Sequence, residues 1–107
     1  MSHKTFPQVW KFVESLTGTT VMTLDRGISN RIIAVTSKGV LRESAGSKQN
    51  RQTVVPRQTF EKIWSELVQN GKCVAVEKKV WRIACAILTK LPEVTYTTRP
   101  LTLYLKR

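Results

Sequence analysis

The stretch that decides the fold runs from Arg57 to Lys106 and reads RQTFEKIWSELVQNGKCVAVEKKVWRIACAILTKLPEVTYTTRPLTLYLK. Its first part places apolar residues at positions 60, 63, 64, 67 and 68, which is the spacing of one buried helix face. Asn70-Gly71 then stops the helix, because glycine readily adopts the left-handed conformation that follows a helix end. The stretch therefore begins with an amphipathic helix over residues 57–70.

A second helix and a hairpin follow. Residues 72–76 form a short link that we expect to be extended, and the apolar spacing over 77–91 predicts the second helix, which Pro92 ends. Over residues 94–106, apolar and polar side chains alternate on both sides of a turn at 97–100. Strict alternation of this kind predicts a β-hairpin.

Ahead of this stretch, the chain reads as a helix followed by short strands. The helix begins at Thr5 and stops before Gly18. Glycine-bearing turns then separate runs rich in β-branched residues, which predicts an antiparallel meander with strands at 19–24, 30–36 and 40–44 and a short fourth strand at 53–55. The continuous apolar run 32–35 predicts that the middle strand is covered on both faces.

Together these elements predict an α+β fold: an N-terminal helix, a small antiparallel meander, two helices and a C-terminal β-hairpin. At 107 residues the chain is long enough to bury one core, and no linker or internal repeat divides it. We expect a single domain over 1–107, with the first helix and meander in 5–56 and the second half in 57–106.

The charge balance points to a polyanionic partner. Eighteen Lys and Arg face seven Asp and Glu, so the net charge is +11 and the isoelectric point is near 10.3. Such a field attracts nucleic acid. The chain contains no apolar run of membrane-spanning length and no apolar signal core at its start, so we expect a cytoplasmic protein without a membrane partner, nucleoid-associated in a bacterium.

The helix–link–helix–hairpin outline of residues 57–106 resembles that of winged-helix DNA-binding domains. The resemblance implies that the second helix enters a groove of the DNA and that the hairpin tip, the wing, touches the sugar-phosphate backbone. The usual module has three helices, whereas 57–91 offers two. Either the N-terminal helix takes the third place, or the module is degenerate, or the resemblance is accidental.

The candidate contact residues follow from this outline and from the loop 45–53, which is rich in hydrogen-bond donors. The outward face of the second helix combines basic residues with the small Ala86 (or Cys85), which would allow a close approach to a groove. We expect base contacts from Arg82 and Thr89. We expect phosphate contacts from Lys48, Arg51, Arg57, Lys78, Lys79, Lys90 and Arg99.

Two other classes of function stay open beside non-enzymatic DNA binding. One is a small RNA-binding protein or a metal-free, ribonuclease-like toxin; the other is an adaptor that docks on an acidic protein. A Glu77-x-Lys79 pair after an apolar run, with Asp25 before it, matches a common nuclease pattern only loosely. Because a domain of this size binds weakly alone, we expect a homodimer or a larger complex.

Metal and cofactor chemistry has little support. Cys73, Cys85 and the single His3 are too few and too far apart for a structural zinc site. We interpret both cysteines as small core residues. No cofactor, no metal ligand and no catalytic residue is predicted.

Overall fold

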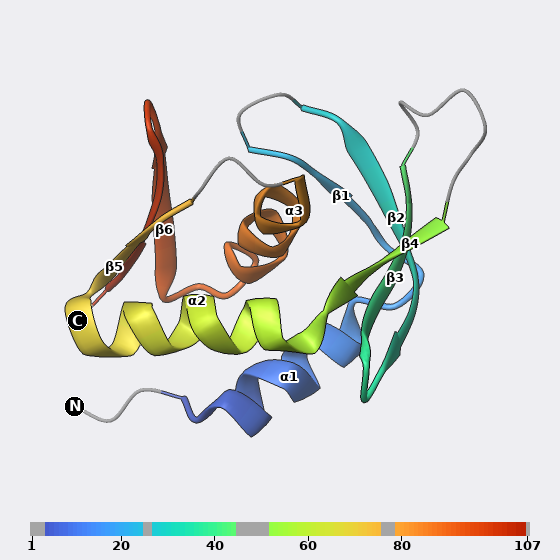
Figure 1. Cartoon of the computed structure of the whole chain (residues 1–107), viewed down its shortest axis with the longest axis horizontal. Helices are drawn as coiled ribbons and strands as arrows, with labels where there is room; N and C mark the ends of the chain where they lie inside the picture. Colours follow the sequence, from blue (N-terminus) through green and yellow to red (C-terminus); the bar gives the residue numbers. More distant parts are fainter. Residues whose placement is uncertain (1–3, 25–26, 45–51, 76–78, 107) are drawn as a thin grey trace.

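The computed structural model describes residues 4–24, 27–44, 52–75 and 79–106, with backbone alone for Lys79 and Val80. Figure 1 shows three helices and two antiparallel sheets in this part of the chain. The helices are α1 (Phe6–Ser15), α2 (Arg57–Asn70) and α3 (Lys79–Leu88). The strands are β1 (Thr20–Met22), β2 (Ser29–Thr36), β3 (Gly39–Ser44), β4 (Gln52–Pro56), β5 (Lys72–Val74), β6 (Val94–Thr98) and β7 (Leu101–Leu105). The predicted α+β class is confirmed.

The central element is α3. It lies between the two sheets and against α2, while α1 lies on the other side of α2 (Figure 1). Its residues from Ile83 to Leu88 are each at most 1% exposed. The buried residues of all three helices and both sheets join in one cluster around it. A run of six consecutive nonpolar residues, IACAIL, makes this position favourable, because every side of the helix meets another element.

The first sheet is the predicted meander, in the order β1-β2-β3-β4. Its strands pair antiparallel, and the register shifts between Ile32 and Ala34, where β2 carries a bulge. Ile32 is fully buried, whereas residues 33–35 are half-buried. The expectation that 32–35 is covered on both faces is therefore wrong. The bulge, rather than burial on two faces, breaks the alternation there.

The second sheet has the order β5-β7-β6, so the C-terminal hairpin adds to the short strand that follows α2. The predicted hairpin and the predicted extended link are both confirmed. The helix predicted over 57–70 is α2, with Gly71 in the left-handed conformation at its end. The helix predicted over 77–91 is α3, which ends at Leu88, three residues earlier than predicted; residues 77 and 78 lie outside the described residues.

Aromatic contacts attach α1 to α2. The Trp64 indole Nε1 donates a hydrogen bond of 3.0 Å to the backbone carbonyl of Lys4, just ahead of α1. The rings of Trp10 and Phe60 meet edge to face, with centroids 5.3 Å apart. Buried aromatic pairs of this geometry stabilise a fold beyond the area that they remove from water. The N-terminal helix therefore belongs to the same core as the C-terminal half.

Close packing against β4 leaves no room for a side chain at Gly39. Gly39 begins β3 with φ +153°, and a Cβ at this position would collide with the backbone carbonyl of Val55 on β4. We expect Gly39→Ala to lower the free energy of unfolding by about 2–4 kcal/mol, from backbone strain together with overpacking. Gly18→Ala is the matched control, since Gly18 also has a positive φ but nothing lies within 4 Å of its Cβ. Equal losses in chemical denaturation would contradict this account.

Candidate nucleic-acid interface

The three-stranded sheet has one covered and one open face. Leu101, Leu103 and Leu105 of the middle strand β7 are buried against the core. Their neighbours in the strand, Thr102 and Tyr104, point to the opposite face because side chains alternate along a strand. Figure 1 shows no helix on that side of the sheet. This open face belongs to the hairpin that the sequence predicts as a wing.

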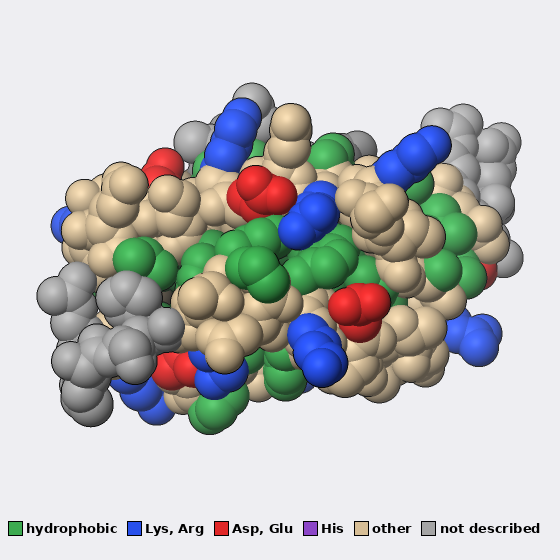
Figure 2. Space-filling view, turned by 90° about the horizontal axis from the view of Figure 1, so that it is seen from below, with side chains coloured by type: hydrophobic (Ala, Val, Ile, Leu, Met, Phe, Trp, Pro, Cys, Tyr) green, Lys and Arg blue, Asp and Glu red, His purple; other side chains and the backbone are tan. Residues whose placement is uncertain are grey.

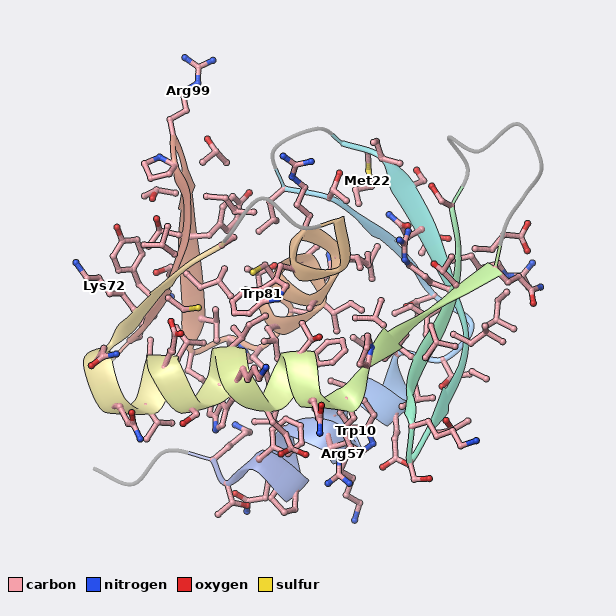
Figure 3. All side chains as sticks on the ribbon, in the orientation of Figure 1. Trp10, Met22, Arg57, Lys72, Trp81 and Arg99 are labelled. Atoms are coloured by element: carbon pink, nitrogen blue, oxygen red, sulfur yellow. The ribbon has the colours of Figure 1, made fainter. Side chains whose placement is uncertain are left out.

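Two rows of side chains make up the open face. Tyr104 lies between Lys72 on β5 and Thr95 on β6 in the register of the sheet, and its side chain remains 38% exposed. In the next row Thr102 lies between Val74 and Thr97. Figure 3 shows Lys72 pointing away from α3. Thr102 itself is only 4% exposed, and its hydroxyl donates a hydrogen bond of 3.1 Å to the carbonyl of Pro100. The face thus combines an aromatic ring, a lysine and the hydroxyl groups of Thr95 and Thr97.

No carboxylate belongs to this sheet. Strands β5, β6 and β7 and the turn at 99–100 contain Lys72 and Arg99 but no Asp or Glu, and Lys106 follows directly after β7. Arg99 is exposed at the turn, at the far end of the hairpin from the core (Figure 3). By contrast, the face around α1 in Figure 2 mixes acidic and basic side chains around an apolar band. The sheet β5-β7-β6 is therefore better suited than the face around α1 to bind a polyanion.

The nearest acid in sequence is already neutralised. Glu93, just before β6, accepts a hydrogen bond of 2.7 Å from the Lys4 ammonium group. Desolvation acts to raise the pKa of Glu93, but the hydrogen bond from Lys4, a backbone hydrogen bond and the charge of Lys4 together hold the pKa below its ordinary value. This carboxylate therefore stays charged and paired at neutral pH. Its negative field at the base of the wing is correspondingly small.

The helix predicted to enter a groove does not have the predicted outward face. The expectation that Ala86 or Cys85 lies on an exposed basic face is wrong, since they are 1% and 0% exposed. The 3.6-residue period identified one apolar stripe but could not show that a second sheet covers the other side. Among the residues whose side chains are described, the surface is reached only at the start of α3, by Trp81 and Arg82, and just after its end, by Thr89 and Lys90.

The candidate base-contact residues lie at these two ends. Arg82, half-buried, is in the first turn of α3, and Thr89 follows the last helical residue. Seven residues of helix separate them by about 10 Å along the axis. The Thr89 hydroxyl donates a 2.7 Å hydrogen bond to the carbonyl of Ala86, and Lys90 beside it is exposed. Because residues 83–88 between them are buried, Arg82 and Thr89 do not form one continuous reading surface.

Arg57 has a different environment from the other candidates. Its guanidinium lies over the rings of Phe6 and Trp10, 5.4 and 5.6 Å from their centroids, and its Nε is 3.6 Å from the Glu61 carboxylate. Figure 3 shows it beside α1, far from the wing tip at Arg99. Arg57 joins α1 to the start of α2. The structure does not bring it together with the wing.

Lys48, Arg51 and Lys78 lie outside the described residues, as does the side chain of Lys79. In Figure 1 the end of β3 and the start of β4, which flank Lys48 and Arg51, lie at the right of the view, whereas the wing tip lies at the left. The end of β5 and the start of α3, which flank Lys78, lie between them.

The sequence did not lead us to predict two residues of the open face, Lys72 and Tyr104. Lys72 was assigned to a link, and Tyr104 was treated only as the polar partner of the leucines in the hairpin. The alternation LTLYLK already indicated that Tyr104 is on the face opposite the leucines. That Lys72 lies beside it became visible only from the pairing of β5 with β7.

Catalytic features are sparse in the described part. Both cysteines are buried, as predicted, and burial, followed by a hydrogen bond with Glu66, raises the pKa of the Cys73 thiol far above its ordinary value. Such a thiol is not a nucleophile at neutral pH. Asp25 and Glu77 of the nuclease pattern lie outside the described residues. Within the described ranges, no group of three potential metal ligands occurs, and no helix is both long and apolar enough to cross a bilayer.

A shallow pocket of about 270 Å³ lies between the N-terminal segment and α2. Its lining is mainly apolar, with the hydroxyl groups of Thr5 and Ser65 among its few polar groups. The lining residues are Lys4, Thr5, Phe6, Trp64, Ser65, Val68 and Gln69. We therefore place the candidate interface at the wing rather than at this pocket.

Comparison of the chain with protein-family models, with curated proteins and with solved structures gives no significant match.

The environment of Arg57 leads to a stability prediction. Arg57→Ala should lower the free energy of unfolding by about 1–2 kcal/mol, because it removes the guanidinium and its alkyl chain from Phe6 and Trp10. Arg31→Ala, at an exposed arginine of β2, should change it by less than about 0.5 kcal/mol. Urea denaturation of both variants measures this, and equal effects would assign Arg57 no structural role.

Proposed function

We propose that this chain is a non-enzymatic nucleic-acid-binding protein that binds double-stranded DNA through its wing. The observation that carries the proposal is the three-stranded sheet without any carboxylate, with exposed Arg99 at its tip, on a chain of net charge +11. Positive groups on a surface free of acids gain affinity for phosphates by releasing counterions from the DNA. We therefore propose that the polyanionic partner expected from the net charge binds at the three-stranded sheet.

The order of elements supports the same proposal. Helix α2, strand β5, helix α3 and the β6–β7 hairpin follow one another as in a winged-helix module, and β5 pairs with the hairpin. One helix fewer than usual is found between residues 57 and 91. In our proposal α3 is a core helix that offers Arg82 at its first turn, and the wing supplies most of the contact.

Affinity in this arrangement comes mainly from phosphate contacts. Arg99 would contact the backbone from the tip, with Lys72 and Lys106 along the sheet. Phosphate contacts fix orientation but carry no sequence information. We therefore propose weak sequence preference, with any base readout confined to Arg82 at the start of α3.

A second candidate is binding of single-stranded nucleic acid, RNA included. Tyr104 favours it, because an exposed ring on the middle strand of an open sheet can stack on an unpaired base. Lys72 and the threonine hydroxyls beside it would hold the backbone of the strand. Duplex DNA, whose bases are already stacked, would not use the ring in this way.

The first experiment measures binding of a short DNA duplex by fluorescence anisotropy at several salt concentrations. Arg99→Ala should weaken binding by about three- to tenfold and lower the slope of log K against log salt by about 1. Lys38→Ala is the matched control, since Lys38 is also an exposed cation of a turn, the one between β2 and β3, which lies far from the wing tip in Figure 1. No binding at low salt, or equal effects of the two substitutions, would refute the proposal.

A further experiment separates duplex from single-stranded partners. If single strands bind on the open face, Tyr104→Ala should weaken binding of a single-stranded oligonucleotide by about tenfold, because it removes one stacking interaction. Tyr96→Ala controls for the loss of an exposed tyrosine, since Tyr96 is on the same sheet but points to the other face. A small effect of Tyr104→Ala on both single strands and duplex would eliminate the second candidate.

A further inference from the structure

A relay of hydrogen bonds on the four-stranded sheet holds one arginine in place. The carbonyl of Ile28 accepts a hydrogen bond of 2.9 Å from the Asn30 amide Nδ2. The Oδ1 of the same amide accepts a hydrogen bond of 2.6 Å from Nη1 of Arg42. Asn30 is only 1% exposed, so both its polar atoms are used inside the protein. These two hydrogen bonds thereby fix the position of the Arg42 guanidinium within the folded protein.

The sheet register shows which face this arginine occupies. Arg42 lies between the buried Ile32 on β2 and Thr53 on β4, so it shares the inner face of the sheet that packs toward α3. The next residue, Glu43, points to the opposite face, where Arg31 is its cross-strand neighbour. The carboxylate closest in sequence is therefore on the wrong side to neutralise Arg42.

The charge of Arg42 is not compensated within the described residues. The two ion pairs found there join Lys4 to Glu93 and Arg57 to Glu61. Burial lowers the pKa of Arg42, which indicates a cost of desolvation, although an arginine keeps its charge at neutral pH. Among the described residues, Arg42 is thus a half-buried cation held by a neutral amide and paired with no carboxylate.

The unoccupied donors of Arg42 lie on one edge of the guanidinium. Asn30 occupies Nη1, while Nε is buried without an acceptor and Nη2 donates to no described residue. The Nε–Nη2 edge is a planar fork whose two N–H groups match two oxygens of a phosphate or carboxylate. A buried donor without a partner requires an explanation, and a bound ion is one of the ordinary ones.

We propose that Arg42 is an oxyanion-binding residue whose ligand is a phosphate group, held on the Nε–Nη2 edge and oriented by Asn30. The phosphate can belong to a nucleic-acid backbone or be free in solution. The proposal does not depend on the wing, because Arg42, Asn30 and Ile28 lie in and beside the four-stranded sheet. Arg42 was not among the residues singled out from the sequence, where it is one of eighteen Lys and Arg.

The test observes the arginine directly. The Nε–H resonance of Arg42 is identified by NMR from its disappearance in Arg42→Lys, and the wild-type protein is titrated with inorganic phosphate at constant ionic strength. We expect a saturable shift of the Arg42 signal and no saturable shift of the Arg31 signal, since Arg31 is an exposed arginine of the same sheet. Equal, unsaturated drift of both signals, with inorganic phosphate and with a short oligonucleotide alike, would overturn the proposal.

Asn30→Asp provides the decisive variant. It places a carboxylate at the position of the Asn30 amide, next to the guanidinium, and so supplies internally the negative charge that we assign to the ligand. We expect the phosphate-dependent shift to fall at least tenfold in apparent affinity, together with a higher melting temperature in chloride buffer. An unchanged phosphate response in a folded Asn30→Asp protein would contradict the proposal. Should this variant not fold, the wild-type titration still decides the matter.

A second arm identifies the source of the phosphate. A shift saturated by inorganic phosphate alone assigns the site to a free phosphate group, whereas a shift seen only with a short oligonucleotide assigns it to the nucleic-acid backbone. No shift with either ligand refutes the site. Because Arg99→Ala leaves the phosphate titration unaffected, failure of the wing proposal and failure of this one are distinguishable.

Discussion

The burial of α3 on all sides is the constraint on which the rest of the structure depends. The four-stranded sheet has an apolar inner face that includes Ile32 and Val55, and the three-stranded sheet has another that includes Leu103. One nonpolar helix covers both, with α2 on its third side (Figure 1). A chain of 107 residues forms few helices, so a single helix packs against the apolar faces of both sheets.

Because α3 is buried between the two sheets, the polar side chains that can contact a partner lie mainly on other elements. A helix packed between two sheets cannot also lie along a DNA groove, and among its described side chains only those of the first turn reach the surface. The three-stranded sheet, in contrast, is covered on one side only and keeps an open face with Tyr104 and Lys72. Surfaces of this kind contact phosphates and unpaired bases through charge and stacking, which give affinity more readily than sequence discrimination.

Three arginines illustrate how neighbours decide the role of a residue type. Arg57 lies on aromatic rings and beside Glu61, so its charge is largely used within the fold. Arg99 stands in solvent at the wing tip, where its charge is available to a partner. Arg42 is half-buried and held by Asn30, with no carboxylate paired to it among the described residues, and we propose that one edge of its guanidinium binds an anion.

Much of the fold could be predicted from the sequence, because its elements are specified locally. The stripe ending at Val68, the stop at Gly71 and the alternation over 94–105 depend on residues a few positions apart, and they correspond to α2 and to the β6–β7 hairpin. The excess of Lys and Arg is likewise a property of the sequence alone, and it is the basis for expecting a polyanionic partner.

What the tertiary structure decided depends on contacts between distant segments. Periodicity located one apolar face of α3, but burial of Cys85 and Ala86 on the other face required the second sheet to be in place. The pairing of Arg42 with Asn30 spans twelve positions, and Lys72 meets Tyr104 only through strand pairing. The sequence by itself determined the elements and the charge of this protein, whereas the side chains that remain available to a partner were decided by packing, because exposure is a property of the assembled fold.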